Sequence, residues 1–385
     1  MEREIYLDHA ASTPVREVAR DAWSAAAATH HANPTGSHAA ARAARRALDD
    51  ARDLVAAALD RPPAEVVFTS GGSEADNLAI RGVLATKGGT AVCSAGEHHA
   101  VLEPVEHAGG SVVPLDPDGR VTPEALKAVL SDLDDVSIVS VMAVNNETGA
   151  INDLPSLVAA TREVAPNAFF HTDAVQAVSW IDLATAVADV DLISVTGHKL
   201  GGPIGTGVLF VRHGVELGAQ ILGGGQERGR RAGTPDVAGG VAFAAAMEAT
   251  VAARPAEIAR LGALRDELLA GLVARLGDVV RPTLLGRGFD DQVAAGFVHI
   301  CLDGVEAEAL LFLLDNQGLC ASAASSCSSG AQDPSHVLAS MGIDRNLAQG
   351  SLRLSFGHTS TRDDVVAALE IISPAVERLL AHGGG

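Results

Sequence analysis

The sequence predicts an α/β fold with a mostly parallel sheet, followed by a smaller α+β domain. Three observations support this prediction. Short, almost wholly apolar segments recur through the first part of the 385-residue chain, and segments of helical character separate several of them. The pattern then changes after Arg254-Pro255. Apolar strands that alternate with helices are typical of a parallel sheet covered by helices on both faces.

The candidate strands of the first part are rich in Val, Ile, Leu and Phe. They are residues 65–69, 90–94, 111–115, 136–144, 168–172, 190–195 and 207–211. The helices expected between them include residues 74–84, 124–130 and 155–164. Ligands of parallel sheets bind beyond the carboxyl ends of the strands, so polar residues at those ends are candidate functional residues.

The last third of the chain has a different order of elements. We expect a helix over residues 256–276, strands over 294–302 and 351–355, and a final helix over 362–381. The final helix follows Thr359-Ser-Thr361, a sequence typical of helix N-termini. A second, smaller domain therefore begins in the helical region around residues 250–265.

Composition excludes several classes of function. The 48 acidic residues exceed the 28 Lys and Arg, and the formal net charge of −20 argues against direct binding to nucleic acid or to an anionic membrane surface. The most apolar run, residues 237–247, is too short to span a bilayer. Because the N-terminus also lacks the apolar core of a signal peptide, we predict a cytoplasmic protein without a membrane segment.

The four cysteines do not form a metal-binding or redox motif. They are Cys93, Cys301, Cys320 and Cys327. No C-x-x-C pair occurs, so neither a metal centre nor a thioredoxin-like site is predicted. Cys93 and Cys301 lie in apolar strands and Cys320 has apolar neighbours, so these three are expected to be buried. Cys327 lies among serines, which predicts a free, working thiol.

One lysine is a candidate for covalent catalysis. The chain has only three lysines, and Lys199 follows an apolar strand in a polar turn flanked by glycines. Unlike arginine, lysine can lose its proton and act as a nucleophile and base. An amine at a strand end can bind a carbonyl cofactor covalently. On its own, this position is equally compatible with an exposed surface lysine.

Three other strand ends carry residues suited to pyridoxal phosphate. The segment Ser70-Gly-Gly-Ser73 precedes an expected helix and offers backbone N–H groups to a phosphate. Asp173 could keep a pyridine nitrogen protonated, and Asn145-Asn146 offers amides to a carboxylate or ring oxygen. Each also has a structural reading, as a loop, a helix cap or a turn. The G-x-G-x-x-G pattern of dinucleotide-binding proteins is absent from these segments.

Nine ordered motifs give the chain a specific resemblance to the cysteine desulfurases over nearly its full length. They are Tyr6-Leu-Asp-His-Ala-Ala-Ser-Thr-Pro14, Asn33-Pro-Thr-Gly-Ser-His38, Phe68-Thr-Ser-Gly-Gly-Ser-Glu-Ala-Asp-Asn77, Glu97-His-His-Ala-Val-Leu102, Val144-Asn-Asn-Glu-Thr-Gly149, Thr172-Asp-Ala-Val-Gln176, Thr196-Gly-His-Lys199, Gly223-Gly-Gly-Gln-Glu-Arg-Gly-Arg-Arg-Ala-Gly-Thr234 and Ser325-Ser-Cys327-Ser-Ser-Gly330. The resemblance implies a fold-type I pyridoxal-phosphate enzyme with a mixed, mostly parallel seven-stranded sheet. We predict a large domain of residues 14–255 and a small domain of residues 1–13 and 256–385.

The resemblance also implies how pyridoxal phosphate is held. Lys199 would bind it covalently, Asp173 would pair with the ring nitrogen and Gln176 with the ring oxygen. His98 would lie over the ring and assist proton transfer, and Asn146 would lie beside it. The phosphate would be bound by Gly72, Ser73, Thr196, His198 and, across a homodimer interface, Thr234 of the partner subunit.

The implied substrate is L-cysteine. Arg353 would bind its carboxylate, with Asn146 and Asn33 nearby, because a guanidinium fork fits a carboxylate. The amine of Lys199 would remove the α-proton, and the Cys327 thiolate would take the sulfur as a persulfide while L-alanine leaves. A proton acceptor such as His98 would raise the thiolate fraction of a group that titrates at about 8.5.

One position departs from the family pattern. Members with a long cysteine loop commonly read Ser-Ser-Gly-Ser-Ala-Cys, whereas this chain reads Ser322-Ala-Ala-Ser-Ser-Cys327. Alanine at position 324 removes the backbone freedom of glycine. The sequence therefore predicts a stiffer loop, or one that rests in a different conformation.

Several alternatives remain open from the sequence. A selenocysteine lyase or an aminotransferase has the same scaffold, and an aminotransferase has no need of Cys327. A sulfur-pathway scaffold without catalysis is a second alternative, and an NAD-dependent dehydrogenase is a third. The sulfur acceptor is expected to be a protein. The destinations known for the family are iron–sulfur clusters and tRNA thiolation, and similarity to the desulfurase of DNA phosphorothioation adds a further one.

Overall fold

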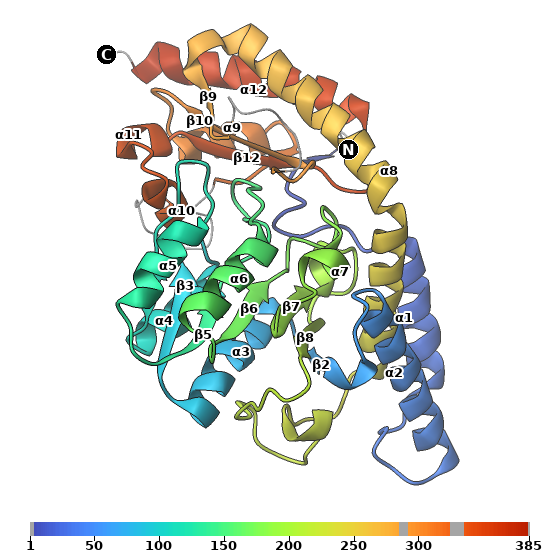
Figure 1. Ribbon diagram of the computed structural model, residues 1–385. Helices are drawn as coiled ribbons and strands as arrows, with labels where there is room; N and C mark the ends of the chain where they lie inside the picture. Colours follow the sequence, from blue (N-terminus) through green and yellow to red (C-terminus); the bar gives the residue numbers. More distant parts are fainter. Residues whose placement is uncertain (1–3, 285–291, 324–334, 384–385) are drawn as a thin grey trace.

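The computed structural model describes residues 4–284, 292–323 and 335–383 (Figure 1). The helices are α1 (Glu17–Thr29), α2 (Ala39–Ala57), α3 (Gly72–Lys87), α4 (His99–His107), α5 (Pro123–Ser131), α6 (Leu154–Val164), α7 (Leu183–Ala186), α8 (Val237–Leu276), α9 (Ala307–Asp315), α10 (His336–Ser340), α11 (Arg345–Ala348) and α12 (Arg362–Gly383). The strands are β1 (Ile5–Tyr6), β2 (Val66–Thr69), β3 (Thr90–Ser94), β4 (Ser111–Val113), β5 (Val136–Ser140), β6 (Phe169–Asp173), β7 (Leu192–Thr196), β8 (Gly207–Val211), β9 (Val280–Pro282), β10 (Phe297–Leu302), β11 (Leu319–Cys320) and β12 (Ser351–Ser355).

The central sheet has seven strands in the order β2-β8-β7-β6-β5-β3-β4. The strands from β7 to β4 are parallel, and β8 and β2 are antiparallel to their neighbours. β8 runs antiparallel to β7 because residues 197–206 connect them by a turn too short for a crossover helix. The mixed, mostly parallel seven-stranded sheet expected from the sequence is therefore confirmed.

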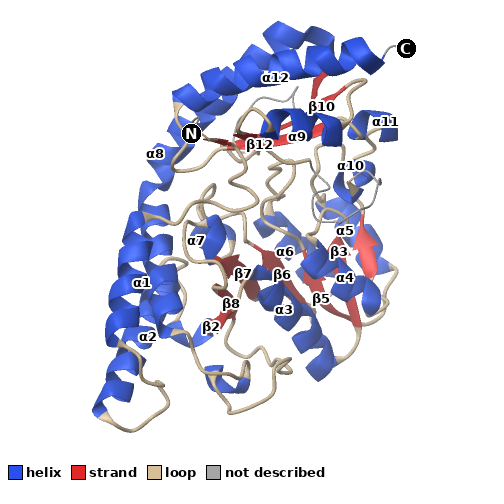
Figure 2. Ribbon diagram, turned by 180° about the vertical axis from the view of Figure 1, so that it is seen from behind, coloured by secondary structure: helices blue, strands red, loops and turns tan. Residues whose placement is uncertain are grey.

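Helices cover both faces of this sheet, as Figure 2 shows from behind. Neighbouring residues of one strand point to opposite faces, so Ile138 and Val139 of β5 belong to different buried clusters. The Ile138 face packs against α3 and α4. The Val139 face packs against helices that include α5, α6 and α8. This double covering explains why the strands read as continuous apolar segments.

Another buried cluster, separate from the two on the faces of the large sheet, surrounds a three-stranded antiparallel sheet of order β12-β10-β9. α9, α12 and the C-terminal half of α8 supply the helical side of this cluster. The N-terminal residues Ile5 and Leu7 belong to it as well, because β1 pairs in parallel with β11. The predicted domain boundary at residue 255 falls inside α8, whose two halves contribute to different buried clusters.

α8 is much longer than expected. The predicted helix over residues 256–276 is the second half of a 40-residue helix that begins at Val237 and continues through Pro255. It runs along one side of the molecule from the large sheet to the small one (Figure 1). α8 is long and apolar enough to cross a membrane, but 50% of its most apolar window is buried inside the protein. Such burial is typical of a core helix.

Candidate active site

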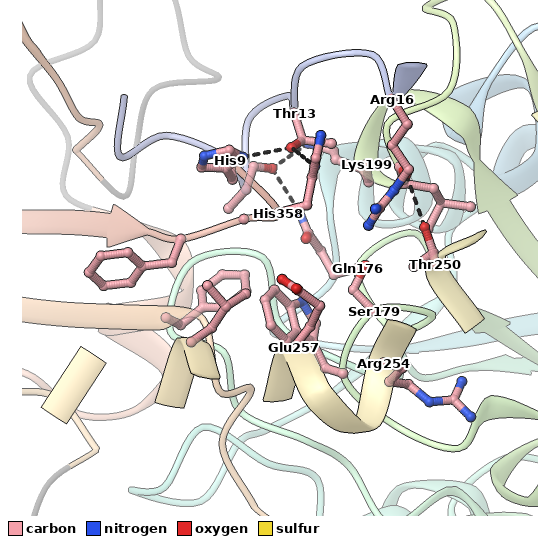
Figure 3. A pocket seen from close by; sticks show the side chains of 17 residues that line it. His9, Thr13, Arg16, Gln176, Ser179, Lys199, Thr250, Arg254, Glu257 and His358 are labelled. Atoms are coloured by element: carbon pink, nitrogen blue, oxygen red, sulfur yellow. Dashed lines mark hydrogen bonds between the residues drawn. The ribbon is translucent and has the colours of Figure 1, made fainter. Parts of the chain in front are cut away.

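Lys199 ends a short 3₁₀ turn, Gly197–Lys199, directly after β7. Its Nζ donates a hydrogen bond to the carbonyl oxygen of Ala11 at 2.7 Å and a second one to that of Ala10. Gln176 Nε2 donates to the same Ala10 oxygen at 2.7 Å. Lys199 and Gln176 also line one cavity, together with His9 (Figure 3). The N-terminal segment therefore brings these two predicted site residues together.

Asp173 and His98 form the second part of the site. Asp173 is the last residue of β6, is buried, and accepts a hydrogen bond from the Val175 N–H at 2.8 Å. Burial raises the pKa of the Asp173 carboxyl, although the nearby His98, the hydrogen bond from the Val175 N–H and Lys199 oppose that shift. His98 caps the N-terminus of α4, and burial lowers its pKa. The mutual electrostatic influence of Asp173, His98 and Lys199 places the three groups in one neighbourhood.

A buried polar network, which the sequence analysis did not identify, adjoins Asp173. His171 Nδ1 and Nε2 lie 2.8 Å and 3.0 Å from the hydroxyls of Ser140 and Ser194. Asp76 Oδ1 is 3.7 Å from His171 Nε2 and has no hydrogen-bond partner among the described residues. Burial, followed by the nearby Asp173 carboxylate, raises the pKa of Asp76. Two carboxyl groups that share a buried site do not readily ionise together, so Asp173 is the better candidate for the charged one.

The neutral state of His171 predicts a loss of stability in acid. Burial lowers its pKa to about 3, whereas histidine in an unfolded chain titrates near 6.5. Stability present above pH 6.5 is therefore lost as the pH falls toward 3, because only the unfolded chain takes up the proton. Between pH 6.5 and 5 the expected loss is about 2 kcal/mol. Other buried histidines, such as His299, also contribute to the pH dependence of the wild type. Measured by urea unfolding at both pH values, the difference in stability should therefore be smaller in His171→Asn than in the wild type by about this amount.

The exposed His382 of α12 provides the matched control for this measurement. His382→Asn should keep the pH dependence of the wild type. An unchanged difference between the two pH values in His171→Asn would contradict the assignment of the effect to this ring.

The N-terminus of α3 packs closely against the segment after β6 and lies near Thr196, the last residue of β7. Gly71 has a φ of +153°, a conformation that side chains rarely allow, and Gly72 begins the helix. A Cβ at Gly72 would lie 2.7 Å from Val175 Cγ2 and 3.9 Å from Thr196 Cβ. Glycine at position 72 is therefore required by the close packing of α3 against Val175. The first N–H groups of a helix have no intrahelical partner and can bind an anion there.

His198 and Thr196 lie on the same turn as Lys199. Thr196 Oγ1 donates to the Thr206 carbonyl at 3.1 Å, and His198 Nδ1 lies 3.4 Å from Ser12 Oγ. Burial and the charge of Lys199 lower the pKa of His198 to about 4, so its ring is neutral at pH 7. A neutral ring offers one N–H donor and one acceptor.

Arg353 lies on β12, in the small antiparallel sheet. Its Nη1 donates to the Asn146 carbonyl at 2.7 Å and its Nη2 to Asp8 Oδ1 at 2.9 Å, while Nε is buried without a hydrogen-bond partner in the described part of the chain. Residues from the N-terminus, from the segment after β5 and from β12 thus meet at one guanidinium. By contrast, the Asn145 side chain holds its own turn, accepting hydrogen bonds from the N–H groups of Glu147 and Thr148 at 2.9 Å each.

Cys327 lies outside the described residues, as does Ala324. Ser322, five residues before Cys327 in the sequence, forms two backbone hydrogen bonds with Arg353. On the other side, the Ser335 hydroxyl donates to the buried Glu147 carboxylate. Both chain ends that flank the undescribed segment are therefore attached next to Arg353 and Asn146.

The other three thiols are poor nucleophiles. Cys93 and Cys301 are buried, as predicted, and burial raises the pKa of both, that of Cys301 to about 11. The prediction that Cys320 is buried was wrong, because the short strand β11 leaves it half-buried. Burial and nearby acidic groups still raise its pKa. A group with a raised pKa has less thiolate at neutral pH.

Two predicted site residues, Asn33 and Thr234, lie away from the residues around Lys199 and Asp173 when a single chain is considered. Asn33 is exposed in the connection between α1 and α2, where its Oδ1 accepts hydrogen bonds from the Thr35 N–H and hydroxyl. Thr234 is exposed and lines a different cavity with Ser70 and Thr206. Their predicted roles therefore remain predictions.

The arrangement fits pyridoxal phosphate. It provides an amine for a carbonyl carbon in Lys199, a buried carboxyl in Asp173 for a ring nitrogen, and a side-chain amide in Gln176. The N-terminus of α3, which begins at Gly72, provides backbone N–H donors for a phosphate.

Comparisons with known proteins also indicate a pyridoxal-phosphate enzyme. The aminotransferase class-V family matches residues 5–367. The IscS-like cysteine desulfurase of Mycobacterium tuberculosis is 42% identical over 386 residues, covering 97% of this chain and 96% of the relative. A solved NifS-like protein has a TM-score of 0.89 at 30% identity, covering 98% of this chain and 100% of its own. DndA from Streptomyces lividans has a TM-score of 0.73 at 32% identity, covering 91% and 99%.

Proposed function

Because the chain belongs to the class-V aminotransferase family and is a pyridoxal-phosphate-dependent cysteine desulfurase, we propose that Cys327 accepts the sulfur of L-cysteine as a persulfide. The observation that carries this proposal is the backbone pairing of Ser322 with Arg353. It attaches the segment that contains Cys327 beside the guanidinium that is the best candidate for the substrate carboxylate. In the sequence, Cys327 follows Ser322 by five residues.

The proposal gives each predicted residue a chemical role. Bound pyridoxal phosphate supplies a protonated ring that withdraws electrons from the substrate α-carbon. The residues that would hold it are Lys199, Asp173, Gln176, His98, Asn146, Gly72, Ser73, Thr196, His198 and Thr234 of the partner subunit. Lys199 removes the α-proton at Nζ. Arg353, whose buried Nε has no hydrogen-bond partner among the described residues, orients the substrate carboxylate.

Sulfur transfer balances without an external oxidant. The Cys327 thiolate attacks the substrate sulfur, an S–S bond forms, and the C–S bond of L-cysteine breaks. The electron pair of that bond remains with the substrate carbon, which takes up a proton and leaves as L-alanine. His98 is the proton acceptor for the thiol, since its lowered pKa keeps the ring neutral at pH 7.

The functional unit is a homodimer in the cytoplasm. Thr234 is exposed on one chain and belongs to a glycine-rich segment, which suits it to reach the phosphate site of a second copy. Asn33, also exposed, is assigned to the same interface, near the substrate of the partner. Sedimentation equilibrium of the purified protein tests the dimer directly.

The persulfide passes to an acceptor protein. The net charge of −20 disfavours direct contact with nucleic acid, even if the final destination is a phosphorothioate in DNA. The similarity to DndA supports that destination, and the similarity to an IscS-like desulfurase supports iron–sulfur cluster assembly or tRNA thiolation. Tight DNA binding by the isolated dimer at physiological salt would contradict transfer through a protein.

The decisive experiment follows the sulfur atom. The purified enzyme is incubated with L-cysteine without reductant, alkylated, digested and analysed by mass spectrometry, while alanine is quantified in parallel. We expect one additional sulfur on the peptide that contains Cys327. Alanine formation without any protein persulfide would indicate a lyase, and a persulfide on Cys320 alone would move the acceptor to β11.

A further inference from the structure

Glu74 places a negative charge at the end of α3 where the proposed phosphate site lies. It is the third residue of that helix and directly follows Ser73. Its Oε2 accepts a hydrogen bond from the Ser70 N–H at 2.8 Å, so the carboxylate faces the turn that precedes the helix. A carboxylate in this position benefits from the helix dipole when it is alone, but it repels a second anion at the same N-terminus.

Arg231 compensates this charge with a two-point contact. Its Nε donates to Glu74 Oε1 at 2.8 Å and its Nη2 to Glu74 Oε2 at 3.3 Å. The two side chains are only 23% and 17% exposed, so solvent screens the pair weakly. Burial alone would raise the pKa of Glu74, but the hydrogen bonds from Arg231 and Ser70 outweigh it and lower the pKa. Glu74 is therefore charged and paired.

The segment that carries Arg231 is itself anchored. Four residues earlier, Glu227 accepts hydrogen bonds from Arg52 Nη1 and Nη2 at 2.8 Å and 2.9 Å, and from the Phe68 N–H at 3.1 Å. The Arg52 and Glu227 side chains are 9% and 5% exposed. Glu227 and Arg228 have φ values of +45° and +57°, which the surrounding contacts must hold in place. These contacts hold the segment in place, so Arg231 stays near Glu74.

We propose that Arg231 neutralises Glu74 so that the N-terminus of α3 can bind the phosphate of the cofactor, which makes the Arg231–Glu74 pair a determinant of cofactor affinity. This inference rests on the proposed phosphate site at Gly72 and Ser73. Arg231 precedes Thr234 by three residues. The Arg231–Glu74 pair therefore also attaches the segment that would reach the phosphate site of the partner subunit to α3, which would form the phosphate site of its own chain.

Three variants separate charge compensation from simple tethering: Arg231→Met, Glu74→Gln and the double variant. The readout is the dissociation constant of pyridoxal phosphate from the cofactor-free protein, measured by absorbance. Arg231→Met leaves a negative charge beside the phosphate and should weaken binding about tenfold or more. Glu74→Gln removes that charge and should bind at least as tightly as wild type. The double variant should regain most of the loss.

Equal weakening in all three variants would overturn the proposal, because it would mean that the pair only fastens the segment. Pyridoxal, which lacks the phosphate, is the matched ligand. Its affinity should be the same in wild type and Arg231→Met, and a parallel loss for both ligands would also overturn the proposal, since it would report general damage.

A further variant distinguishes failure of this inference from failure of the phosphate site itself. Ser73→Ala should weaken pyridoxal phosphate binding if the phosphate lies at α3. If Ser73→Ala weakens binding and Arg231→Met does not, the site stands and the role of Arg231 is refuted. If neither variant affects binding, the phosphate lies elsewhere and both assignments are refuted.

Discussion

Replacement of Cys327 by alanine is expected to lower the formation of both alanine and sulfide by about 10³-fold or more, because the nucleophile that breaks the C–S bond is lost. The protein should still bind pyridoxal phosphate and stay yellow, since no proposed cofactor contact involves this thiol. Both products can be measured in one reaction with L-cysteine and a reductant.

Cys320→Ala is the matched control for this experiment. Cys320 is the half-buried cysteine seven positions earlier, and its removal should leave turnover unchanged. Full activity in Cys327→Ala would exclude the persulfide route and favour a lyase reaction. An inert wild type, by contrast, would indicate that a partner protein is required or that catalysis has been lost.

Lys199→Ala should lower turnover by about 10³-fold or more as well, for a different reason. The chain would lose both the amine that holds the cofactor and the base that removes the α-proton, and general bases alone contribute about 10²–10⁴-fold. The absorbance of the lysine-bound cofactor should disappear, so the spectrum separates this variant from Cys327→Ala. Lys199→Arg should fail similarly, because a guanidinium stays protonated.

Lys127→Ala controls for the general loss of a lysine. Lys127 lies on α5 and forms an exposed ion pair with Glu163 at 2.6 Å, so its removal should change neither turnover nor the spectrum. Substantial residual turnover in Lys199→Ala with a normal spectrum would refute Lys199 as the cofactor-binding residue.

The large sheet could be predicted because its strands are buried on both faces. Burial makes each strand a continuous apolar segment, and β3 and β8 have the predicted boundaries, as does β12 in the small sheet. β5 is shorter than predicted, ending at Ser140 although residues 141–144 are also buried. An apolar segment therefore predicts burial well but predicts the end of a strand less well. The end of a strand depends on where the neighbouring strands stop forming hydrogen bonds with it.

Elements with weak local signals could not be predicted. α1 is rich in alanine and buries only Ala19 and Ala26 in its chain, which leaves little apolar periodicity. β1 and β11 have two residues each and exist only because they pair with one another. No pattern within such short segments could show a partner more than 300 residues away.

The candidate site also contains residues that could be predicted from the sequence and residues that could not. Lys199, Asp173 and Gln176 lie at or after strand ends and in recognisable motifs, so the sequence predicts them as site residues. Asp8, at 2.9 Å from Arg353, and Asp76, beside His171, could not be identified as site residues, because each acts on a group brought close only by folding. A buried carboxyl reads in the sequence like any surface aspartate.

The location of Asp8 and Ala10 also determines when the site can form during synthesis. Arg353, the partner of Asp8, is 345 residues away, and β1 pairs with β11 at Leu319 and Cys320. A ribosome-bound chain that has exposed only the large sheet therefore lacks Arg353 and the strand β11, which pairs with its N-terminal strand β1. The large sheet can form early, but the nascent chain must keep its first residues available until almost the whole protein has emerged. Activity is then a property that only the completed chain acquires.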